Sequence, residues 1–378
     1  MPELIPPFSL TRQSQQLAAE IEPAVARVLA SGRYAQGPEC EAFEKEVAAA
    51  MGAPTLRVAT CSSGTDALHL ALRAVGVRAG DVVLTTPFTF FATAGAILLA
   101  GAVPEFVDIE PGSFNLDPAK LAQALEQPRS ARIGAIMPVH LYGAVAAMPA
   151  ILELAATHGI PVVEDAAQAI GASLDGRSAG AWGAAAAFSF YPTKNLGAMG
   201  EGGMVTTTEP AVDEQLRLLR AHGSRRRYEH GQMGWNGRMH ELQAAILRAK
   251  LPHLAAWNQR RRAIATAYAE RLAEVPGMTL PRHQAGDVFH QFVIRAPRRE
   301  ELRQFLRERE VATEVYYPVP LHQQPALAAY RSTQPLPESE RAAREVLALP
   351  MFPELTDAEV ARVADGVAAF YGGKAARC

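Results

Sequence analysis

Short apolar runs alternate with amphipathic stretches between residues 56 and 207, and this alternation restricts the fold more than any other feature. The apolar runs predict β-strands at Leu56–Thr60, Asp81–Thr85, Val103–Ile109, Ile133–Leu141, Pro161–Asp165, Ala185–Phe190 and Gly203–Thr207. The stretches between and after them predict helices at Thr65–Ala74, Phe91–Ala100, Pro118–Leu125, Ala147–His158 and Pro210–Ala221. Strands that are apolar throughout are typical of a parallel sheet with helices on both faces. We therefore predict an α/β domain with a mainly parallel seven-stranded sheet.

Helical patterns also flank this region on both sides. Leu17–Leu29 predicts a helix that ends at Ser31-Gly32, and Pro23 indicates either a kink or a helix that starts near it. Cys40–Met51 predicts a second helix. A long helical pattern from Arg238 to about Leu272 predicts a connector that leads out of the sheet domain.

The character of the chain changes past Pro276. A strand, a helix, a β-rich run and a closing amphipathic helix are predicted at Val288–Arg295, Arg299–Arg309, Val311–Pro318 and Leu355–Tyr371. We therefore predict two domains: a large α/β domain of residues 1–250, which includes the N-terminal segment, and a smaller α+β domain of residues 251–378.

Composition argues against several classes of protein. A net charge of −2 gives no reason to expect nucleic acid or an anionic membrane as a partner. The three cysteines (Cys40, Cys61 and Cys378) form no CxxC pair, so neither a disulfide framework nor a metal site is expected. The N-terminus lacks the pattern of a signal peptide, and the longest apolar stretch, Phe91–Val103, is too short to span a bilayer. We expect a cytoplasmic protein.

The segment Ala184–Val205 holds the first candidate for chemistry. A single lysine, Lys194, follows the apolar run that contains Ser189, and glycines follow the lysine. Open α/β sheets bind ligands beyond the carboxyl ends of their strands, which is where this lysine should lie. A desolvated ammonium has a depressed pKa and suits a Schiff-base lysine. The alternative is a solvated lysine in a surface loop.

Two further segments carry polar groups to the same edge of the predicted sheet. Asp165 ends a predicted strand and could pair with the protonated ring nitrogen of pyridoxal phosphate, although a helix N-cap is equally compatible with it. The run Cys61–Leu68 opens a helix directly after a strand, where free N–H groups and the helix dipole can bind a phosphate. Ordinary capping by Ser63 or Thr65 is the alternative. The chain has no GxxxxGK[ST] motif, so this is not a nucleotide P-loop.

Two other stretches complete the set. The segment Thr86–Thr93 contains three phenylalanines, one of which could stack on a planar cofactor, although core packing is the commoner role of such rings. The polar turn Gly234–Arg238 stands at the head of the long helical pattern and would otherwise be a surface loop. A phosphate site, an aromatic ring, a carboxylate and an amine, in this order along an α/β chain, point together to pyridoxal phosphate.

The motifs that carry this chemistry resemble those of the DegT/DnrJ/EryC1/StrS sugar aminotransferases, from about residue 8 to the C-terminus. The stretches concerned are SSGTDALHLAL, PFTFFATAGAI, VHLYG, VVEDAAQAIGA, FSFYPTKNLGAMGEGGMV, GWNGRMHELQAAIL and YYPVPLHQQPAL. The resemblance implies a pyridoxal-phosphate enzyme of fold type I, which is the aspartate aminotransferase fold. The family usually has Asn-Gly-Thr at the phosphate helix, whereas this chain has Ser63-Gly64-Thr65.

The resemblance also assigns a role to individual residues. Lys194 would form the Schiff base, Asp165 would pair with the pyridine nitrogen, and Gln168 would lie near the 3-oxygen of the cofactor. Phe90 would stack on the ring, while Gly64, Thr65 and Ser189 would bind the phosphate. Family members are homodimers, and Asn236 would reach the phosphate of the neighbouring subunit.

The implied reaction moves an amino group from L-glutamate to a nucleotide-linked keto sugar. The runs that begin at Asn236 and Tyr316 are most similar to those of enzymes that aminate C3 of a keto sugar. The sugars concerned are UDP-2-acetamido-3-keto-glucuronate and dTDP-3-keto-6-deoxyhexose, and the products serve surface polysaccharide or amino-sugar biosynthesis. The Asn-Gly-Arg turn favours the glucuronate group, because a buried Arg238 could bind a carboxylate with both ends of its guanidinium. A surface charge is the alternative for Arg238. The residues expected to face the sugar nucleotide are Tyr34, Gly37, Arg238, Tyr316, Tyr317 and His322.

Three other functions stay open at this stage. The first is amination of a 4-keto nucleotide sugar, and the second is the chemistry of a fold-type relative that acts on amino acids. The third is a regulatory protein that keeps the fold without turnover. A histidine in place of Lys194 would mark the sugar dehydratases of the family, so the lysine argues against that branch. His140 is expected to pack near the end of the sheet rather than to act in catalysis.

Overall fold

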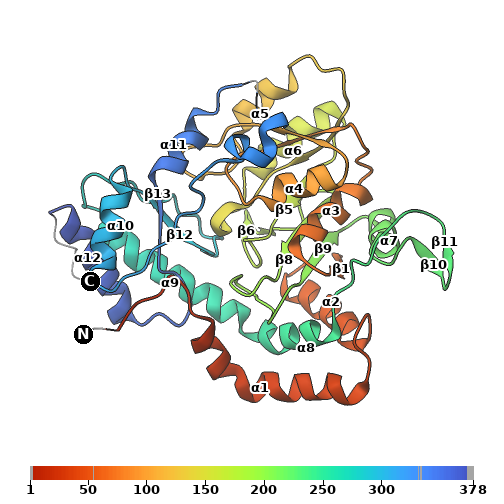
Figure 1. The fold of residues 1–378 in the computed structure, drawn as a ribbon, viewed down its shortest axis with the longest axis horizontal. Coiled ribbons are helices and arrows are strands. Elements are labelled where there is room, and N and C mark those ends of the chain that lie inside the picture. The colour runs from red at the N-terminus through yellow and green to blue at the C-terminus, as the bar shows by residue number, and fades with distance from the viewer. Residues whose placement is uncertain (1–2, 54, 331, 333, 373–378) are drawn as a thin grey trace.

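A sheet of seven strands crosses the larger part of the molecule (Figure 1). The computed structural model describes residues 3–53, 55–330, 332 and 334–372. The strands are β1 (Arg57–Cys61), β2 (Val82–Thr85), β3 (Val103–Phe106), β4 (Ile133–Met137), β5 (Val163–Asp165), β8 (Ala185–Ser189) and β9 (Gly203–Thr207). Ladders join them in the orders β1-β9-β8-β5 and β3-β2-β4. Parallel bridges at Ile136–Val162 and Val139–Asp165 connect β4 to β5 and make the sheet continuous.

The predicted, mainly parallel sheet is confirmed, with β9 as the exception. β2 runs parallel to β3 and β4, and β5 runs parallel to β8, whereas β9 is antiparallel to β1 and β8. Residues 190–202 connect β8 to β9 without a helix. A parallel connection needs a crossover of a dozen or more residues, usually a helix, so this loop, which is occupied by the Lys194 segment, turns the chain back on itself.

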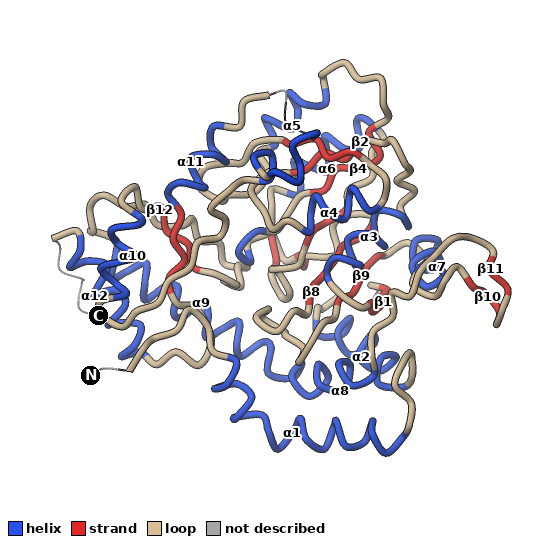
Figure 2. Tube along the Cα trace, in the orientation of Figure 1, coloured by secondary structure: helices blue, strands red, loops and turns tan. Residues whose placement is uncertain are grey.

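Helices cover both faces of the sheet (Figure 2). They are α1 (Leu10–Ser31), α2 (Pro38–Ala50), α3 (Gly64–Ala74), α4 (Ala92–Leu99), α5 (Pro118–Leu125), α6 (Met148–His158) and α7 (Pro210–Leu219). Of the two alternatives at Pro23, a helix that starts near this residue is wrong, because α1 continues through the proline. Gly32 ends α1 in the left-handed conformation (φ 64°), which glycine adopts without a steric penalty.

The long predicted connector is two helices rather than one. α8 (Glu241–Lys250) and α9 (Leu254–Leu272) are separated by a 3₁₀ turn, Leu251–His253, with Pro252 in its middle. Proline lacks the N–H that would continue the α-helical ladder. α8 packs along α1, where Ile246 contacts Leu17 and Ile21.

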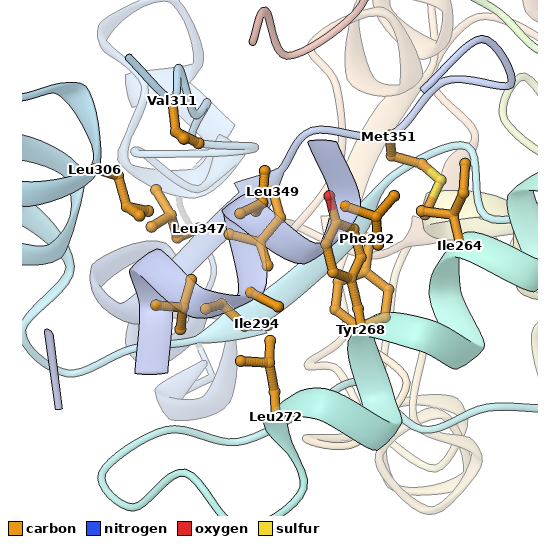
Figure 3. Packing of buried hydrophobic residues seen from close by; sticks show 14 of the residues in the cluster. Ile264, Tyr268, Leu272, Phe292, Ile294, Leu306, Val311, Leu347, Leu349 and Met351 are labelled. Atoms are coloured by element: carbon orange, nitrogen blue, oxygen red, sulfur yellow. The ribbon is translucent and has the colours of Figure 1, made fainter. Parts of the chain in front are cut away.

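The C-terminal region packs around its own hydrophobic cluster (Figure 3). Its elements are β12 (Phe292–Arg295), α10 (Arg299–Arg307), α11 (Pro337–Glu345), β13 (Val346–Leu349) and α12 (Asp357–Phe370). Tyr268 of α9 lies against Phe292, with ring centroids 5.1 Å apart, and Ile5 from the N-terminal segment joins the same cluster. The division of the chain near residue 250 stays a prediction.

The sequence patterns missed or misassigned several short elements of the C-terminal region. α11 and β13 were not predicted, and β13 pairs antiparallel with β12. The run Val311–Pro318 forms no regular strand; it makes single bridges, from Val311 to Ile5 and from Glu314 to Ala348. Prolines such as Pro318 and Pro320 limit ladder formation in this stretch.

Two small hairpins complete the fold. β6 (Ser173–Leu174) pairs with β7 (Arg177–Ser178), and β10 (Ser224–Arg226) pairs with β11 (Glu229–His230). The second hairpin projects from the body of the molecule (Figure 1), and Tyr228 at its tip is 82% exposed. No helix in the described ranges is both long enough and apolar enough to cross a bilayer.

Candidate active site

A cavity of about 520 Å³ opens where β1, β2, β5 and β8 end. Its wall is formed by Ser63, Gly64, Thr65, Leu68, Thr89, Phe90, Ala92, Thr93, Val139, Asp165, Ala167, Gln168, Ser189, Tyr191, Thr193, Lys194, Glu201, His290, Gln291, Tyr316 and Tyr317. The carboxyl ends of these strands point the same way, so turns that are distant in sequence meet at one edge of the sheet. Residues 290–291 and 316–317 close the cavity from the C-terminal region.

Lys194 is partly buried on the cavity wall, in the loop that follows β8. Burial lowers the pKa of Lys194 to about 8, and the negative charge of Asp165 opposes that change. The next residue, Asn195, is buried and donates from Nδ2 to Asn258 Oδ1 (2.9 Å) and to the Val288 carbonyl (3.0 Å). These bonds fix the loop directly beside the lysine. Lys194 is therefore not a freely solvated lysine in a surface loop.

Asp165 is the last residue of β5 and is buried. Thr93 Oγ1 donates to Asp165 Oδ2 (2.8 Å), and the backbone N–H of Ala167 donates to Oδ1 (3.2 Å). Burial raises the pKa of Asp165, and the bond from Thr93 is the largest influence against that rise. No helix begins directly after β5 in the described chain, where the next elements are β6 and β7, so Asp165 is not a helix N-cap.

Thr93 is itself fixed by a second threonine. Thr89 Oγ1 and Thr93 Oγ1 are 3.0 Å apart, and both side chains are buried. Since an ionised Asp165 only accepts hydrogen bonds, the Thr93 hydroxyl donates to Asp165 and accepts from the Thr89 hydroxyl. The sequence patterns did not single out either threonine, although both are polar residues within the aromatic segment that follows β2.

The first turn of α3 lies at one end of the cavity. Ser63 is the N-cap, and its Oγ accepts from the N–H of Asp66 (3.1 Å), so the capping interpretation holds for this residue. Gly64 and Thr65 occupy the first positions of the helix, whose N–H groups have no intrahelical partner. Ser189 lies directly opposite: a Cβ on Gly64 would be 2.6 Å from Ser189 Cβ. Only glycine leaves room for the serine here.

Gln168 and Phe90 also face the cavity. Gln168 Oε1 accepts from the backbone N–H of Tyr142 (2.6 Å), and its Nε2 donates to the Tyr317 hydroxyl (3.1 Å). Phe90 is 59% exposed, and its ring centroid is 6.2 Å from that of Tyr317. Phe88, by contrast, is fully buried in the core. Phe90 is thus free to contact a planar ligand.

Other predicted substrate contacts lie outside the cavity of their own chain. Tyr34 is 52% exposed, and the N–H of Gly37 donates to Glu241 Oε1 (2.7 Å). His322 Nε2 lies 3.2 Å from Glu340 Oε1. None of these predicted contacts lines the cavity, whereas Tyr316 and Tyr317 do.

The turn that carries Asn236 and Arg238 is likewise away from the cavity. Arg238 Nε donates to Asn236 Oδ1 (2.8 Å), and Asn236 is exposed. The expectation of a buried Arg238 is wrong, because its side chain is only partly buried. Behind the turn, Trp235 Nε1 donates to Asp66 Oδ1 (3.1 Å), and Gly237 accepts from the N–H of Ser62 (3.1 Å). The turn therefore rests on the start of α3.

A buried pair lies behind Asp165. His140 Nε2 is 2.8 Å from Glu164 Oε2, and the N–H of Ala146 donates to His140 Nδ1 (3.2 Å). The carboxylate of Glu164 also accepts from the N–H groups of Gly180, Trp182 and Gly183, each at 2.8 Å. His140 does not line the cavity, as predicted, and the pair ties β5 to the turn before β8.

The cavity fits pyridoxal phosphate in the chemistry of its groups. It combines an amine of depressed pKa, a buried carboxylate with two hydrogen-bond donors, and a helix N-terminus beside a hydroxyl. These groups match an aldehyde, a protonated ring nitrogen and a phosphate. Within the described residues, no group of three or more His, Cys, Asp or Glu side chains could hold a metal ion.

Comparison with known proteins gives matches along nearly the whole chain. The profile described as the DegT/DnrJ/EryC1/StrS aminotransferase family matches residues 15–368. The chain is 47% identical to a "Pleiotropic regulatory protein" of Geobacillus stearothermophilus, covering 97% of this chain and 98% of that protein. It is 45% identical to a dTDP-3-amino-3,4,6-trideoxy-α-D-glucose transaminase of Streptomyces venezuelae (96% and 95%). It is 44% identical to a UDP-N-acetyl-3-dehydro-α-D-glucosamine 3-aminotransferase of Acidithiobacillus ferrooxidans (95% and 96%).

Two solved structures resemble this fold closely. The crystal structure of S. venezuelae DesV in complex with a ketimine intermediate has a TM-score of 0.93 and 44% identity, covering 98% of this chain and 99% of that one. The structure of NtdA from Bacillus subtilis with bound PMP has a TM-score of 0.91 and 30% identity, covering 98% and 86%.

Proposed function

The chain belongs to the DegT/DnrJ/EryC1/StrS aminotransferase family, and from that premise we propose that it moves an amino group from L-glutamate to C3 of a nucleotide-linked keto sugar. It is a pyridoxal-phosphate-dependent sugar aminotransferase of fold type I. The amino donor, the position on the sugar and the roles of individual residues are the proposed part.

One observation carries the proposal: a single cavity brings together Lys194, Asp165, the first turn of α3 and Ser189. Pyridoxal phosphate, when bound, supplies an electron sink that stabilises a carbanion at the reacting carbon. Asp165 would hold a proton on the ring nitrogen. Lys194 Nζ, neutral in a substantial fraction near pH 8, would accept the proton from the α-carbon of the amino donor.

The remaining groups would bind and orient. Gly64, Thr65 and Ser189 would hold the phosphate, Phe90 would contact one face of the ring, and Gln168 would lie near the 3-oxygen. Thr93 would keep Asp165 in one orientation, since a hydrogen bond to a charged group is worth about 1.5–3 kcal/mol.

The names of the relatives support the C3 position. Three relatives above 40% identity are named for the 3-amino group or the 3-keto carbon, two on a dTDP sugar and one on a UDP sugar. The preference for a glucuronate substrate rested on a buried Arg238, so it has lost that support. The nucleotide therefore stays open between UDP and dTDP, and Tyr316 and Tyr317 are the candidates for contacting the sugar.

A homodimer with shared active sites is part of the proposal. Asn236, Tyr34 and Gly37, which lie outside the cavity of their own chain, would contact the neighbouring subunit or its ligands. Exposed apolar side chains such as Phe91 (41%) and Tyr228 (82%) are the kind of surface that a second copy would cover. A cytoplasmic location is proposed with it; Cys40 and Cys61 are unpaired.

A test of the cross-subunit contact is Asn236→Ala. The variant should bind pyridoxal phosphate more weakly, because the phosphate loses a donor from the neighbouring subunit, and titration of cofactor absorbance measures the change. Lys120→Ala, on an exposed position of α5 away from the cavity and from the turn, is the control. Equal cofactor affinity in Asn236→Ala and wild type would contradict the contact.

A regulatory role without turnover is the second candidate, because the relative at 47% identity is named as a regulatory protein. The two functions separate in one experiment. Purified protein is offered L-glutamate with a panel of UDP- and dTDP-linked 3-keto and 4-keto sugars, and 2-oxoglutarate is measured. Turnover with a 3-keto sugar supports the proposal, and turnover only with 4-keto sugars assigns C4. No turnover by a yellow, cofactor-bound protein favours regulation, and Lys194→Ala should abolish both colour and turnover.

A further inference from the structure

His290 is a buried histidine on the cavity wall, in the segment before β12. It lines the cavity together with Lys194. No motif in the sequence pointed to it, and the chemistry proposed above does not use it. Its surroundings nevertheless fix its protonation state and its position.

The tautomer of His290 follows from the amides behind it. Asn258 Nδ2 donates to the carbonyl oxygen of Ile170 (3.1 Å), which leaves Asn258 Oδ1 facing Asn195. Asn195 Nδ2 donates to that Oδ1 and to the carbonyl oxygen of Val288. Both oxygens only accept, so Asn195 must present its own Oδ1 to His290 Nδ1, 3.2 Å away. His290 Nδ1 therefore carries the proton.

The imidazole is neutral, so Nε2 holds a free lone pair. Burial lowers the pKa of His290 well below its ordinary value, and the positive charges of Lys194 and Arg261 act in the same direction. Nε2 accepts no hydrogen bond within the described part of the chain. His290 thus offers an unused acceptor on the wall of the cavity that Lys194, a hydrogen-bond donor, also lines.

The backbone of His290 is held as firmly as its ring. Arg261 of α9 donates from Nη1 to the carbonyl oxygens of Phe289 (3.2 Å), His290 (3.3 Å) and Met351 (3.1 Å). Burial lowers the pKa of Arg261 to about 10. On the other side, a Cβ on Gly143 would lie 2.9 Å from the backbone nitrogen of His290. A buried cation and a close glycine contact therefore fix where the imidazole stands.

We propose that His290 is a positioning residue for Lys194: when the amine is free, Nζ turns toward His290 and donates a hydrogen bond to Nε2, which fixes the direction of the amine's lone pair. The inference rests on the proposed role of Lys194. The hydrogen stays on Lys194 Nζ, no proton moves to His290, and the lone pair of Nζ faces the carbon from which it takes a proton. Misorientation of a reacting group by about 1 Å can cost about a hundredfold in rate.

Two substitutions separate this role from a structural one. In His290→Gln, the side-chain amide reaches the place of Nε2 and can still accept from Lys194. In His290→Asn, the amide reaches only the place of Nδ1, so the contact with Asn195 is kept and the acceptor for Lys194 is lost. His283→Gln, on a histidine that does not line the cavity, is the control.

Two measurements are made on each variant. The first is the single-turnover rate with L-glutamate, followed by the absorbance of the bound cofactor. The second is the pH dependence of Lys194 acetylation by acetic anhydride in cofactor-free protein, read by mass spectrometry. His290→Asn should slow the turnover at least about tenfold. It should also lower the pKa of Lys194, because the ammonium loses an acceptor. His290→Gln and His283→Gln should stay within about threefold of the wild-type rate.

The order of the variants decides the outcome. A wild-type rate in His290→Asn, an unchanged Lys194 pKa in that variant, or a Gln variant as slow as the Asn variant would each overturn the proposal. If His290→Asn does not fold, Gly143→Ala, which displaces the backbone of His290, must slow turnover instead, and a wild-type rate there overturns it. The acetylation experiment needs neither cofactor nor sugar, so a failure of the proposed function leaves the effect of His290 on Lys194 measurable.

Discussion

Replacing Lys194 by methionine should raise the free energy of unfolding of the cofactor-free protein at neutral pH. Burial lowers the pKa of Lys194 from 10.5 to about 8 in the folded chain. The unfolded chain therefore binds more protons between about pH 8 and 10.5, and the free energy of unfolding rises with pH through that window. Below pH 8 the folded chain carries the full cost of a desolvated ammonium.

The size of this cost follows from the two pKa values. At about 1.4 kcal/mol for each pKa unit, it amounts to about 3 kcal/mol at pH 7 and falls to about 1.4 kcal/mol at pH 9.5. These figures are upper limits, because Lys194 is only partly buried. Methionine has a similar length and no charge, so its apolar contacts should contribute about equally at both pH values.

The assay is equilibrium urea unfolding of wild type and Lys194→Met at pH 7 and pH 9.5, after removal of the cofactor. The stabilisation by the substitution should be about 2 kcal/mol larger at pH 7 than at pH 9.5. Lys120→Met, on an exposed position of α5, is the matched control and should change the free energy of unfolding by less than about 0.5 kcal/mol. A Lys194→Met variant that is less stable than wild type at pH 7, or a stabilisation independent of pH, would refute the reasoning.

Three other substitutions test the groups around the lysine. Thr93→Val removes the hydrogen bond to Asp165 and should raise the dissociation constant of pyridoxal phosphate about tenfold to a hundredfold. Thr89→Val should raise it less, because Thr89 contacts Asp165 only through Thr93. Equal effects of the two substitutions would contradict this arrangement of the hydroxyls. Gly64→Ala places a Cβ against Ser189 and should cost about 1–3 kcal/mol in equilibrium unfolding, with Ser189→Gly in the same chain restoring stability but not cofactor affinity. Glu164→Gln turns an amide toward N–H donors in a buried site and should cost about 3 kcal/mol; an unchanged unfolding midpoint in urea would rule out the bond network drawn around Glu164.

Periodicity sufficed for the sheet and its helices because their patterns are local. Each of the seven predicted strands overlaps an observed one, since an apolar run bounded by turns leaves few alternatives. The same reasoning missed α11 and β13, which follow each other directly from Pro337 to Leu349 with no turn residue between them. It also merged α8 and α9, because Pro252 interrupts the backbone ladder without interrupting the helical spacing of apolar residues.

The part of the cavity that is formed by residues at the ends of strands could be predicted from the sequence. Lys194, Asp165 and Ser189 each end or follow a strand, so topology alone brings them together. Thr93 and His290 could not be found in this way. Thr93 reaches Asp165 from the first turn of α4, and His290 reaches the cavity only because Arg261 and Asn195 hold a loop against it. Contacts of that kind depend on tertiary packing between segments that are distant along the chain.

The charges that line the cavity explain why these contacts matter. Burial shifts the pKa of Lys194 down and that of Asp165 up, so burial favours the neutral form of both groups. A ligand with a protonated ring nitrogen would give Asp165 a positive partner, and Lys194 would hold the ligand's aldehyde carbon through its neutral amine. The cavity is therefore less stable by itself than with its cofactor, and cofactor binding and folding are thermodynamically linked. Thr93 stabilises the carboxylate of Asp165 by donating a hydrogen bond to it. Asn195 fixes the backbone next to Lys194 through its bonds to Asn258 and to the carbonyl of Val288.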